Sequence, residues 1–455
     1  MCLAIPQKHK EILLHISSFF KYGRDNYLPR FVLAFVLCIG KLSMRKLGQE
    51  VLTEQRNKAN VNRAFNNPGF DTHQAYWRFF ELFFRQQILS FPVQWLVIFD
   101  TTTKKTQRRW HRRKRNRGRG GKRRLRNRNG NTIKYKDRGK RGKGSQTHLW
   151  VLGLLITESG TRIPLPRRSY YTKAYAKRHG LKYRSQVDLV VEMLSELRVP
   201  ENVELIVLAD SFFEGKKLDQ LCSKRHFTYV TAVDSHRCLA DEKGTSNGQH
   251  IVALLESLPS KALQEITLDG GSEQYSSFRR GPGRRKARRY LVCKKTLSIA
   301  KLGERWVVFS KKEKIKSKRR SFSTKVLLTN NCQLTAKQIV ELYELRWEIE
   351  LYFKELKSHL HFTDYSFEDF QASEHWVDIV LITFLFLEYR RLQLLRGSLS
   401  PKEAYHLQNA RTPQMMEVVK AEVNKENMLY IQEALKSSYG RKHLMKVLSK
   451  INLVA

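Results

Sequence analysis

Two short apolar runs, each ending in an aspartate, constrain the fold of this chain more than any other feature. They are WLVIFD at residues 95–100 and VELIVLAD at residues 203–210. Short, continuous apolar runs are typical of strands buried on both faces of a sheet. A carboxylate at the end of such a strand lowers stability unless it has a function. A turn or a helix N-cap is enough to explain one aspartate in such a place, but two are more telling. Since ligands gather at strand ends in open mixed α/β sheets, we expect Asp100 and Asp210 to share one site.

Strand and helix patterns alternate around these two runs, which predicts an α/β fold with a mixed sheet. The runs THLWVLGLLI and TRIPLP predict a pair of strands, and FTYVTAV predicts another. The segments SQVDLVVEMLSEL and FFEGKKLDQLCSKR have the helical period. Farther along, the short runs RRYLVCK, RWVVFSK and KVLLTN favour a β-rich insertion. The regions that we predict are a helical N-terminal region at 1–88, the first part of the core at 89–235, the β-rich insertion at 236–333, a core helix at 334–365 and a helical C-terminal region at 366–455.

The two terminal regions are expected to be helical and to lie outside any membrane. A helix-turn-helix-like pair near residues 43–65 suits contact with DNA ends, and a purely structural bundle is the alternative. The C-terminal region is a candidate for dimerisation. The apolar runs FVLAFVLCIG and IVLITFLFLEY are about half as long as a membrane span, so we expect buried helices and no membrane partner. The N-terminus is interrupted by charge and lacks a signal-peptide pattern.

The net charge of +43, from 85 Lys and Arg against 42 Asp and Glu, makes a polyanion the leading expected partner. The charge is concentrated in residues 104–144, the basic segment, where 21 of 41 residues are Lys or Arg and one is acidic. Such a composition cannot form a core, so we expect an arm that contacts phosphates rather than stacking on bases. The candidate DNA-binding residues of the basic segment are Arg108, Arg109, Arg112, Arg113, Lys122, Arg123 and Arg124.

The six cysteines favour neither a zinc site nor a disulfide framework. They stand at positions 2, 38, 222, 238, 293 and 332 and form no C-x-x-C pair. This pattern fits a reducing cytoplasm.

The segment LYELRWEIELYFKELKSHL, residues 342–360, predicts a helix with a charged row on one face, and Thr335 is a candidate N-cap for its start. The row consists of Tyr343, Arg346, Glu350 and Lys357. An apolar arc flanks it on one side, formed by Leu342, Leu345, Ile349, Phe353, Leu356 and Leu360. On its other side we expect packed surface at Trp347 and Leu351, and the expected solvated positions are Glu344, Glu348, Glu355 and His359. The row is either a set of ordinary ion pairs at spacing i,i+4 or a desolvated glutamate held between cations.

The acidic residues of the two strands and of this helix suggest a divalent-metal site. Asp100, Asp210 and Glu350 would offer hard oxygen ligands, which suit Mg²⁺ or Mn²⁺. Two such ions about 4 Å apart are the common device for in-line attack on a phosphodiester. In a chain this basic, the combination indicates phosphoryl transfer on DNA.

Three motifs resemble the DDE transposases of bacterial insertion sequences. The spacing Tyr343-x2-Arg346-x3-Glu350-x6-Lys357 is similar to the Y-R-E-K signature of one subgroup. FDTT at 99–102 resembles the first-aspartate motif of that family, and LADSFF at 208–213 resembles the second. The resemblance spans roughly residues 90 to 365. It departs from the family pattern at Phe212, where a small residue is common, and in the length of the basic segment.

The resemblance implies a ribonuclease H-like core with the β-rich segment inserted before the glutamate. It implies that Asp100, Asp210 and Glu350 are catalytic and hold two Mg²⁺ ions, with Mn²⁺ as a substitute. Tyr343 and the cations Arg346 and Lys357 would contact the DNA or orient the glutamate. The expected activity is cleavage and strand transfer of an insertion-sequence element. The expected partners are the double-stranded terminal inverted repeats, target DNA and a second copy of the chain.

Other functions remain open at this point. A DDE-type nuclease would cut DNA without strand transfer, and a non-catalytic nucleic-acid-binding protein would explain the charge but not the three placed carboxylates. Tyrosine recombinases need a His-x-x-Arg box, which this sequence lacks. The expected location is the bacterial cytoplasm, in association with the nucleoid.

Overall fold

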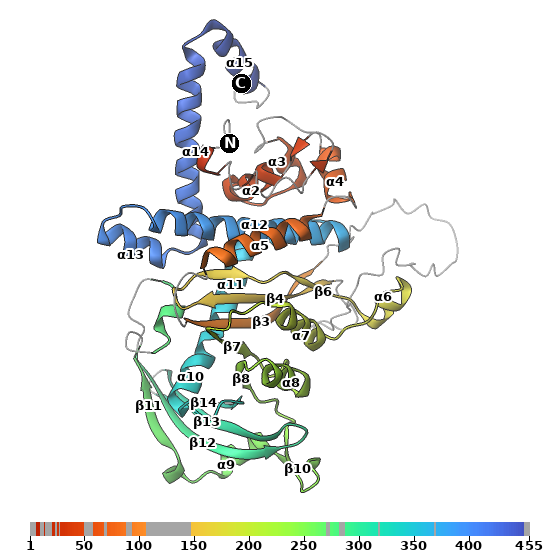
Figure 1. The fold of residues 1–455 in the computed structure, drawn as a ribbon, viewed down its shortest axis with the longest axis vertical. Coiled ribbons are helices and arrows are strands. Elements are labelled where there is room, and N and C mark those ends of the chain that lie inside the picture. Colours follow the sequence, from red (N-terminus) through yellow and green to blue (C-terminus); the bar gives the residue numbers. More distant parts are fainter. Residues whose placement is uncertain are drawn as a thin grey trace.

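The fold is a mixed α/β structure with helical regions at both ends of the chain (Figure 1). The structure, a computed structural model, describes residues 6–9, 13, 21–22, 25–26, 28–49, 58–67, 71–87, 93–105, 147–269, 274–281, 287–316, 319–367 and 370–449. The basic segment lies almost entirely outside these ranges, and so do all seven of its candidate DNA-binding residues.

Five strands form the core of a large sheet, in the order β5-β4-β3-β7-β8. They are β3 (Val93–Lys105), β4 (Thr147–Thr157), β5 (Arg162–Pro164), β7 (Val203–Ala209) and β8 (Thr228–Ala232). β3, β7 and β8 are parallel, whereas β4 runs antiparallel to β3 and to β5. Residues 95–99 of β3 and residues 205–209 of β7 are buried on both faces of the sheet, as their continuous apolar runs predict.

The β-rich insertion extends this sheet instead of forming a separate one. Its last strand, β14 (Arg319–Thr329), pairs antiparallel with β8 and so joins the insertion to the core. The sheet continues through β13 (Gly303–Lys316) and β12 (Arg288–Ile299). The remaining elements of the insertion are β9 (Cys238–Ala240), β10 (Ser246–His250), η1 (Ile251–Ala253), α9 (Leu254–Ser257), η2 (Ser260–Ala262), β11 (Gln264–Leu268) and η3 (Ser276–Phe278).

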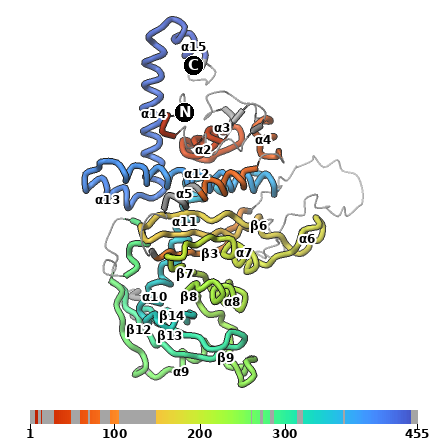
Figure 2. The backbone as a smooth tube through the Cα atoms, viewed as in Figure 1, coloured from red at the N-terminus to blue at the C-terminus, as the bar shows by residue number. Residues whose placement is uncertain are grey.

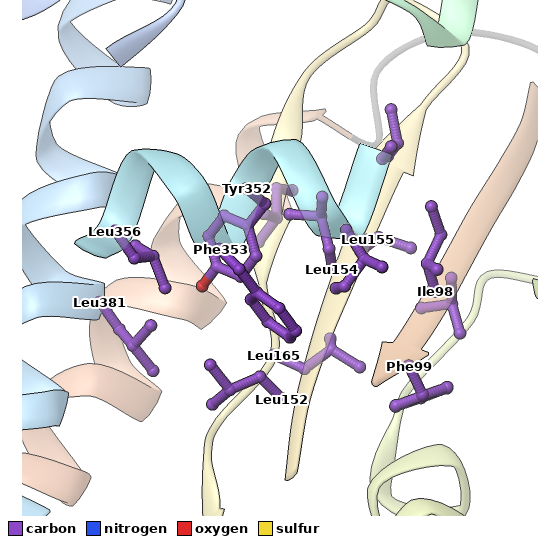
Figure 3. Packing of buried hydrophobic residues seen from close by; sticks show 14 of the residues in the cluster. Ile98, Phe99, Leu152, Leu154, Leu155, Leu165, Tyr352, Phe353, Leu356 and Leu381 are labelled. Atoms are coloured by element: carbon purple, nitrogen blue, oxygen red, sulfur yellow. The ribbon is translucent and has the colours of Figure 1, made fainter. Parts of the chain in front are cut away.

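Helices cover the core strands. α7 (Gln186–Glu196) contacts β4, and α8 (Lys216–Lys224) contacts β8. α10 (Ala336–Leu345) packs against the insertion strands, and α11 (Trp347–Ser358) packs over β3 and β4. Figure 3 shows the α11 contact, in which Tyr352 and Phe353 lie beside apolar side chains of β3 and β4, while Leu356 lies beside Leu381. β6 (Arg168–Tyr170) pairs with β4, and α6 (Lys173–Arg178) follows β6 along the chain.

Helices of the two terminal regions pack together above α11 (Figure 1). α12 (Phe370–Leu395) contacts α2 (Leu28–Leu37), α4 (Lys58–Phe65) and α5 (Thr72–Gln87). The remaining N-terminal elements are β1 (Lys21–Tyr22), β2 (Asp25–Asn26) and α3 (Met44–Gln49). In the described part of the chain, α12 is long and apolar enough to cross a membrane by length and composition, but 89% of its most apolar window is buried inside the protein.

The C-terminal region ends in an extended helical arm. We define the C-terminal arm as α13 (Pro401–Asn409), α14 (Thr412–Leu435) and α15 (Ser438–Ser449). Figure 2 shows α14 projecting away from the sheet, with α15 folded back at its far end. The mixed sheet, the β-rich insertion and the helical regions at both ends confirm the predicted fold class.

Candidate active site

The register of the central strands brings Asp100 and Asp210 together. In the parallel ladder between β3 and β7, Ile98 is opposite Leu208. Two residues farther along each strand are Asp100 and Asp210, so the two carboxylates stand side by side just beyond the end of that ladder. The prediction that β3 ends at Asp100 was wrong, because β3 continues to Lys105. It continues because β4 pairs with it along this whole length, and Asp100 is opposite Leu152.

Short local hydrogen bonds fix both aspartates. The backbone N–H of Thr101 donates to Oδ1 of Asp100 at 2.7 Å. The backbone N–H of Phe212 donates to Oδ1 of Asp210 at 3.0 Å. This bond lies in the turn that follows β7. Phe212, the residue at which the sequence departs from the family pattern, therefore contributes its backbone to the site while its side chain is 56% exposed.

The helix predicted for residues 342–360 is two helices that meet at Arg346. α10 ends at Leu345 and α11 begins at Trp347. At the junction the backbone N–H of Arg346 bonds to the carbonyl of Tyr343, and that of Ile349 bonds to the carbonyl of Arg346. These are i,i+3 bonds, which tighten the chain locally. The predicted N-cap, Thr335, is confirmed, since its side chain accepts from the backbone N–H of Gln338.

Arg346 links the strand and helix parts of the site. Its Nη1 lies 3.4 Å from Oδ2 of Asp100, and its Nη2 lies 3.9 Å from Oε1 of Glu350. Burial is the larger influence on the pKa of Lys357 and lowers it. The charges of Glu350 and Asp100 act in the opposite direction and raise it. Tyr343 is buried, and burial raises its pKa. The structure therefore gathers the whole charged row beside the two aspartates.

The pKa of Asp100 is raised from its usual value to about 6. Burial is the largest cause, and the charges of Asp210 and Glu350 act in the same direction. The backbone bond from Thr101 and the charge of Arg346 oppose the increase without cancelling it. A desolvated carboxyl among other carboxyls is stabilised in its charged form by an added cation.

Asp100, Asp210 and Glu350 fit a divalent cation in donor chemistry and in charge. All three offer carboxylate oxygens, the ligands that Mg²⁺ and Mn²⁺ prefer. Among the described residues, no group of three or more His, Cys, Asp or Glu side chains is arranged closely enough to hold an ion as it stands. Arg346 supplies positive charge between Asp100 and Glu350.

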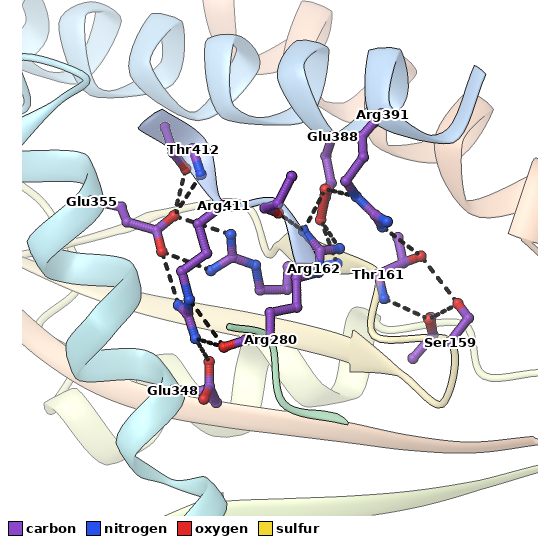
Figure 4. Close-up of polar contacts among 12 residues, drawn as sticks. Ser159, Thr161, Arg162, Arg280, Glu348, Glu355, Glu388, Arg391, Arg411 and Thr412 are labelled. Carbon is purple, nitrogen blue, oxygen red and sulfur yellow. Dashed lines mark hydrogen bonds and ion pairs between the residues drawn. The ribbon is translucent and has the colours of Figure 1, made fainter. Parts of the chain in front are cut away.

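Several helix positions differ from the sequence prediction. Glu348 and Glu355, expected to be solvated, are 1% and 5% exposed. Trp347, expected to be packed, is 56% exposed and stands beside the site. The two glutamates are buried because arginines from distant segments pair with them (Figure 4). The sequence contained one sign of this network, the cation Arg162 in the otherwise apolar run TRIPLP.

A cavity of about 450 Å³ opens beside the charged row. Tyr343, Arg346 and Trp347 line it from the helices, while Lys312 and Lys325 line it from the insertion strands. The insertion therefore places cations in the same cavity as Tyr343 and Arg346 of the charged row.

A second cavity, of about 600 Å³, is larger but lies away from the carboxylates, between α5, β6 and α7. Its arginines are already paired, Arg167 with Asp378 and Arg168 with Glu196. The smaller cavity is the better candidate for a substrate site, because Tyr343 and Arg346 of the charged row line it.

The comparison with known families agrees with the geometry. The family model described as the transposase DDE domain matches residues 175–386, slightly less than half of the chain. This part of the chain is similar to transposase DDE domains. The matched range contains Asp210 and Glu350 but not Asp100, which the strand register places beside Asp210. No curated protein matches the chain.

Proposed function

We propose that the chain is a transposase that cleaves and joins DNA with the help of divalent metal ions. The observation that carries this proposal is the closeness of Asp100 to Asp210 and, through Arg346, to Glu350. The chain has a net charge of +43, and its residues 175–386 are similar to transposase DDE domains. Carboxylates suit the metals of phosphoryl transfer, and the surplus of cations suits a DNA substrate.

Each residue has a role that follows from its position. Asp100, Asp210 and Glu350 would hold two Mg²⁺ ions, for which Mn²⁺ is a substitute. When bound, such ions activate a water or a 3′ hydroxyl for attack and stabilise the leaving oxygen. Arg346 stands where it can contact a phosphate and stabilise developing charge. Lys357 offers a second cation on the same side of α11.

The biological setting is part of the proposal. The Y-R-E-K spacing favours a bacterial insertion-sequence element whose terminal inverted repeats are the DNA substrate. The C-terminal arm is a candidate for forming the homodimer that brings two DNA ends together. The expected location is the bacterial cytoplasm, close to the nucleoid.

The DNA flanking the gene provides the experimental test. We expect inverted repeats bordered by short direct repeats, and we expect purified protein with Mg²⁺ to cut at the outer boundary of each repeat. If the flanks carry no repeats and the DNA stays uncut, the proposal of a transposase is rejected. The remaining interpretation is then a non-catalytic nucleic-acid-binding protein.

Replacing Arg346 by alanine is expected to lower the single-turnover cleavage rate at least about tenfold, which is about 1.4 kcal/mol of transition-state stabilisation. The melting temperature should change little, because the two ion pairs of Arg346 are long, at 3.4 and 3.9 Å, and partly exposed, and such pairs contribute little to stability. Arg346→Lys should not restore the rate fully, since lysine lacks the planar fork that grips two phosphate oxygens. The same loss of rate is expected for Lys357→Ala.

The matched control is Lys354→Ala, which removes an exposed cation from the same helix. It should retain the rate of the unmodified protein. If the cleavage rate is unchanged in both Arg346→Ala and Lys357→Ala, the charged row consists only of ordinary ion pairs.

Deleting residues 108–143 of the basic segment should weaken DNA binding with little dependence on sequence. Each phosphate contact that is lost should lower the slope of log K against log salt by about 0.9. Binding titrations at several salt concentrations measure this slope. An unchanged affinity and slope would show that the basic segment is not a DNA-binding arm.

A further inference from the structure

α11 has two polar faces, and the second one points away from the proposed metal ligands. Glu348 and Glu355 are seven residues apart and therefore share one face of the helix, roughly opposite Glu350. Both are buried, at 1% and 5% exposure. A buried carboxylate is tolerated only when it is paired, so whatever pairs with these two glutamates also fixes the helix that carries Glu350.

One guanidinium, that of Arg411, ties this second face together. Its Nη1 donates to Oε1 of Glu355 at 2.9 Å, and its Nη2 donates to Oε2 of Glu348 at 2.8 Å. The same guanidinium donates to the carbonyl of Arg280, from Nη2 at 2.7 Å and from Nε at 3.2 Å. Figure 4 shows these bonds spanning α11 and the segment that contains Arg280. Only the planar fork of arginine can meet all three acceptors at once.

Arg411 belongs to the C-terminal arm. It immediately precedes α14, and Thr412, the first residue of that helix, donates to Oε2 of Glu355 at 2.5 Å. α13, on the other side of Arg411, has no buried residues, and the buried residues of α14 all lie between Thr412 and Val423. The joint between α13 and α14 is thus the place where the arm touches α11.

We propose that Arg411 is a positioning residue that couples the C-terminal arm to Glu350. The arm holds α11 in register through this joint, so cleavage depends on the contacts of Arg411 with α11 and not on the other contacts of the arm. This inference rests on the proposed function for its catalytic consequence. The mechanical coupling between Arg411 and α11 can be measured without any DNA.

The fold does not depend on Arg411 alone. Arg162 makes two hydrogen bonds of 3.0 Å to the two oxygens of Glu355, and these remain when Arg411 is removed. The chain also offers a matched control in Arg390 of α12, whose Nη2 lies 2.6 Å from Oε1 of Glu422 on α14. Arg390 anchors the same arm to the body, but through α12 and not through α11.

The experiment compares Arg411→Ala, Arg411→Lys and Arg390→Ala in the full chain. Hydrogen exchange of the backbone amides of residues 347–358 is measured without DNA, and single-turnover cleavage and end affinity are measured with Mg²⁺. We expect Arg411→Ala to speed exchange of this segment and to slow cleavage by about tenfold or more, because small displacements of catalytic groups have effects of that size. End affinity should stay within about twofold. Arg411→Lys should be intermediate, and Arg390→Ala should change neither exchange in 347–358 nor cleavage.

Two results would overturn the proposal. One is that exchange of 347–358 or cleavage is the same in Arg411→Ala as in the unmodified protein. The other is that Arg390→Ala has the same effects as Arg411→Ala, since the arm would then act only through general stability. If the unmodified protein cleaves no DNA, the proposed function fails while the exchange comparison still decides the coupling.

Discussion

Asp100→Asn, Asp210→Asn and Glu350→Gln should each lower single-turnover cleavage of a bound DNA end by at least about a thousandfold, or about 4 kcal/mol of transition-state stabilisation. Each substitution keeps the shape of the side chain and removes one carboxylate charge from the proposed site, which would need all three carboxylates to hold its ions. Affinity for the DNA end should change little, because cations supply most of it. The measurements are quenched cleavage assays and binding titrations with the same labelled end.

Asp234→Asn is the matched control for the two aspartates. Asp234 also follows a buried strand, β8, and its carboxylate, like that of Asp210, accepts a hydrogen bond from the backbone N–H two residues later, here that of His236. It should keep the cleavage rate of the unmodified protein. Near-normal cleavage by any one of the three site variants would remove that residue from the proposed active site.

Glu355→Ala should lower the free energy of unfolding by about 3–5 kcal/mol, the usual cost of breaking a buried ion pair by removing one partner. Arg162 is fully buried and would lose both of its bonds to Glu355, while Arg411 would lose one. Denaturant unfolding measures the change. Glu433→Ala, which breaks an exposed pair with Lys436, is the control and should leave the unfolding midpoint nearly unchanged.

The same pair makes stability depend on pH. Burial alone would raise the pKa of Glu355, but Arg162, Thr412 and Arg411 outweigh it and lower the pKa from 4.5 to about 2. A carboxyl whose folded pKa is lowered contributes its stability above its unfolded pKa and loses it as the pH falls toward the folded value. Stability should therefore fall between pH 4.5 and about 2, and this fall should be smaller in Glu355→Gln. An equal pH dependence in both proteins would mean that Glu355 is not held as a charged group.

Much of the core could be predicted because local patterns and burial agree there. The apolar runs that contain Asp100 and Asp210 are strands, and Thr335 caps the helix that it precedes. The joining of the insertion to the core could not be predicted, because it depends on the pairing of β14 with β8, nearly a hundred residues apart in sequence. Such long-range pairing leaves no local pattern.

The two faces of α11 show where sequence reasoning about the site ends. From the sequence, a glutamate on a helix is expected to face solvent because it is charged. Glu348 and Glu355 can be buried only because arginines from other parts of the fold pair with them. Those partners come from positions as distant as Arg162 and Arg411. The break at Arg346 was hidden for a similar reason, since no Pro or Gly marks it.

Strand transfer is the most direct test of the claim that one cluster of carboxylates cuts and joins DNA. The assay incubates the purified chain and Mg²⁺ with a labelled terminal repeat and a circular target, and it then sequences the junctions. We predict that the 3′ end of the repeat becomes joined to target DNA, with a constant stagger between the two strands, and that Glu350→Gln abolishes these products. Cleaved ends without any joined product would contradict transposition and identify a nuclease.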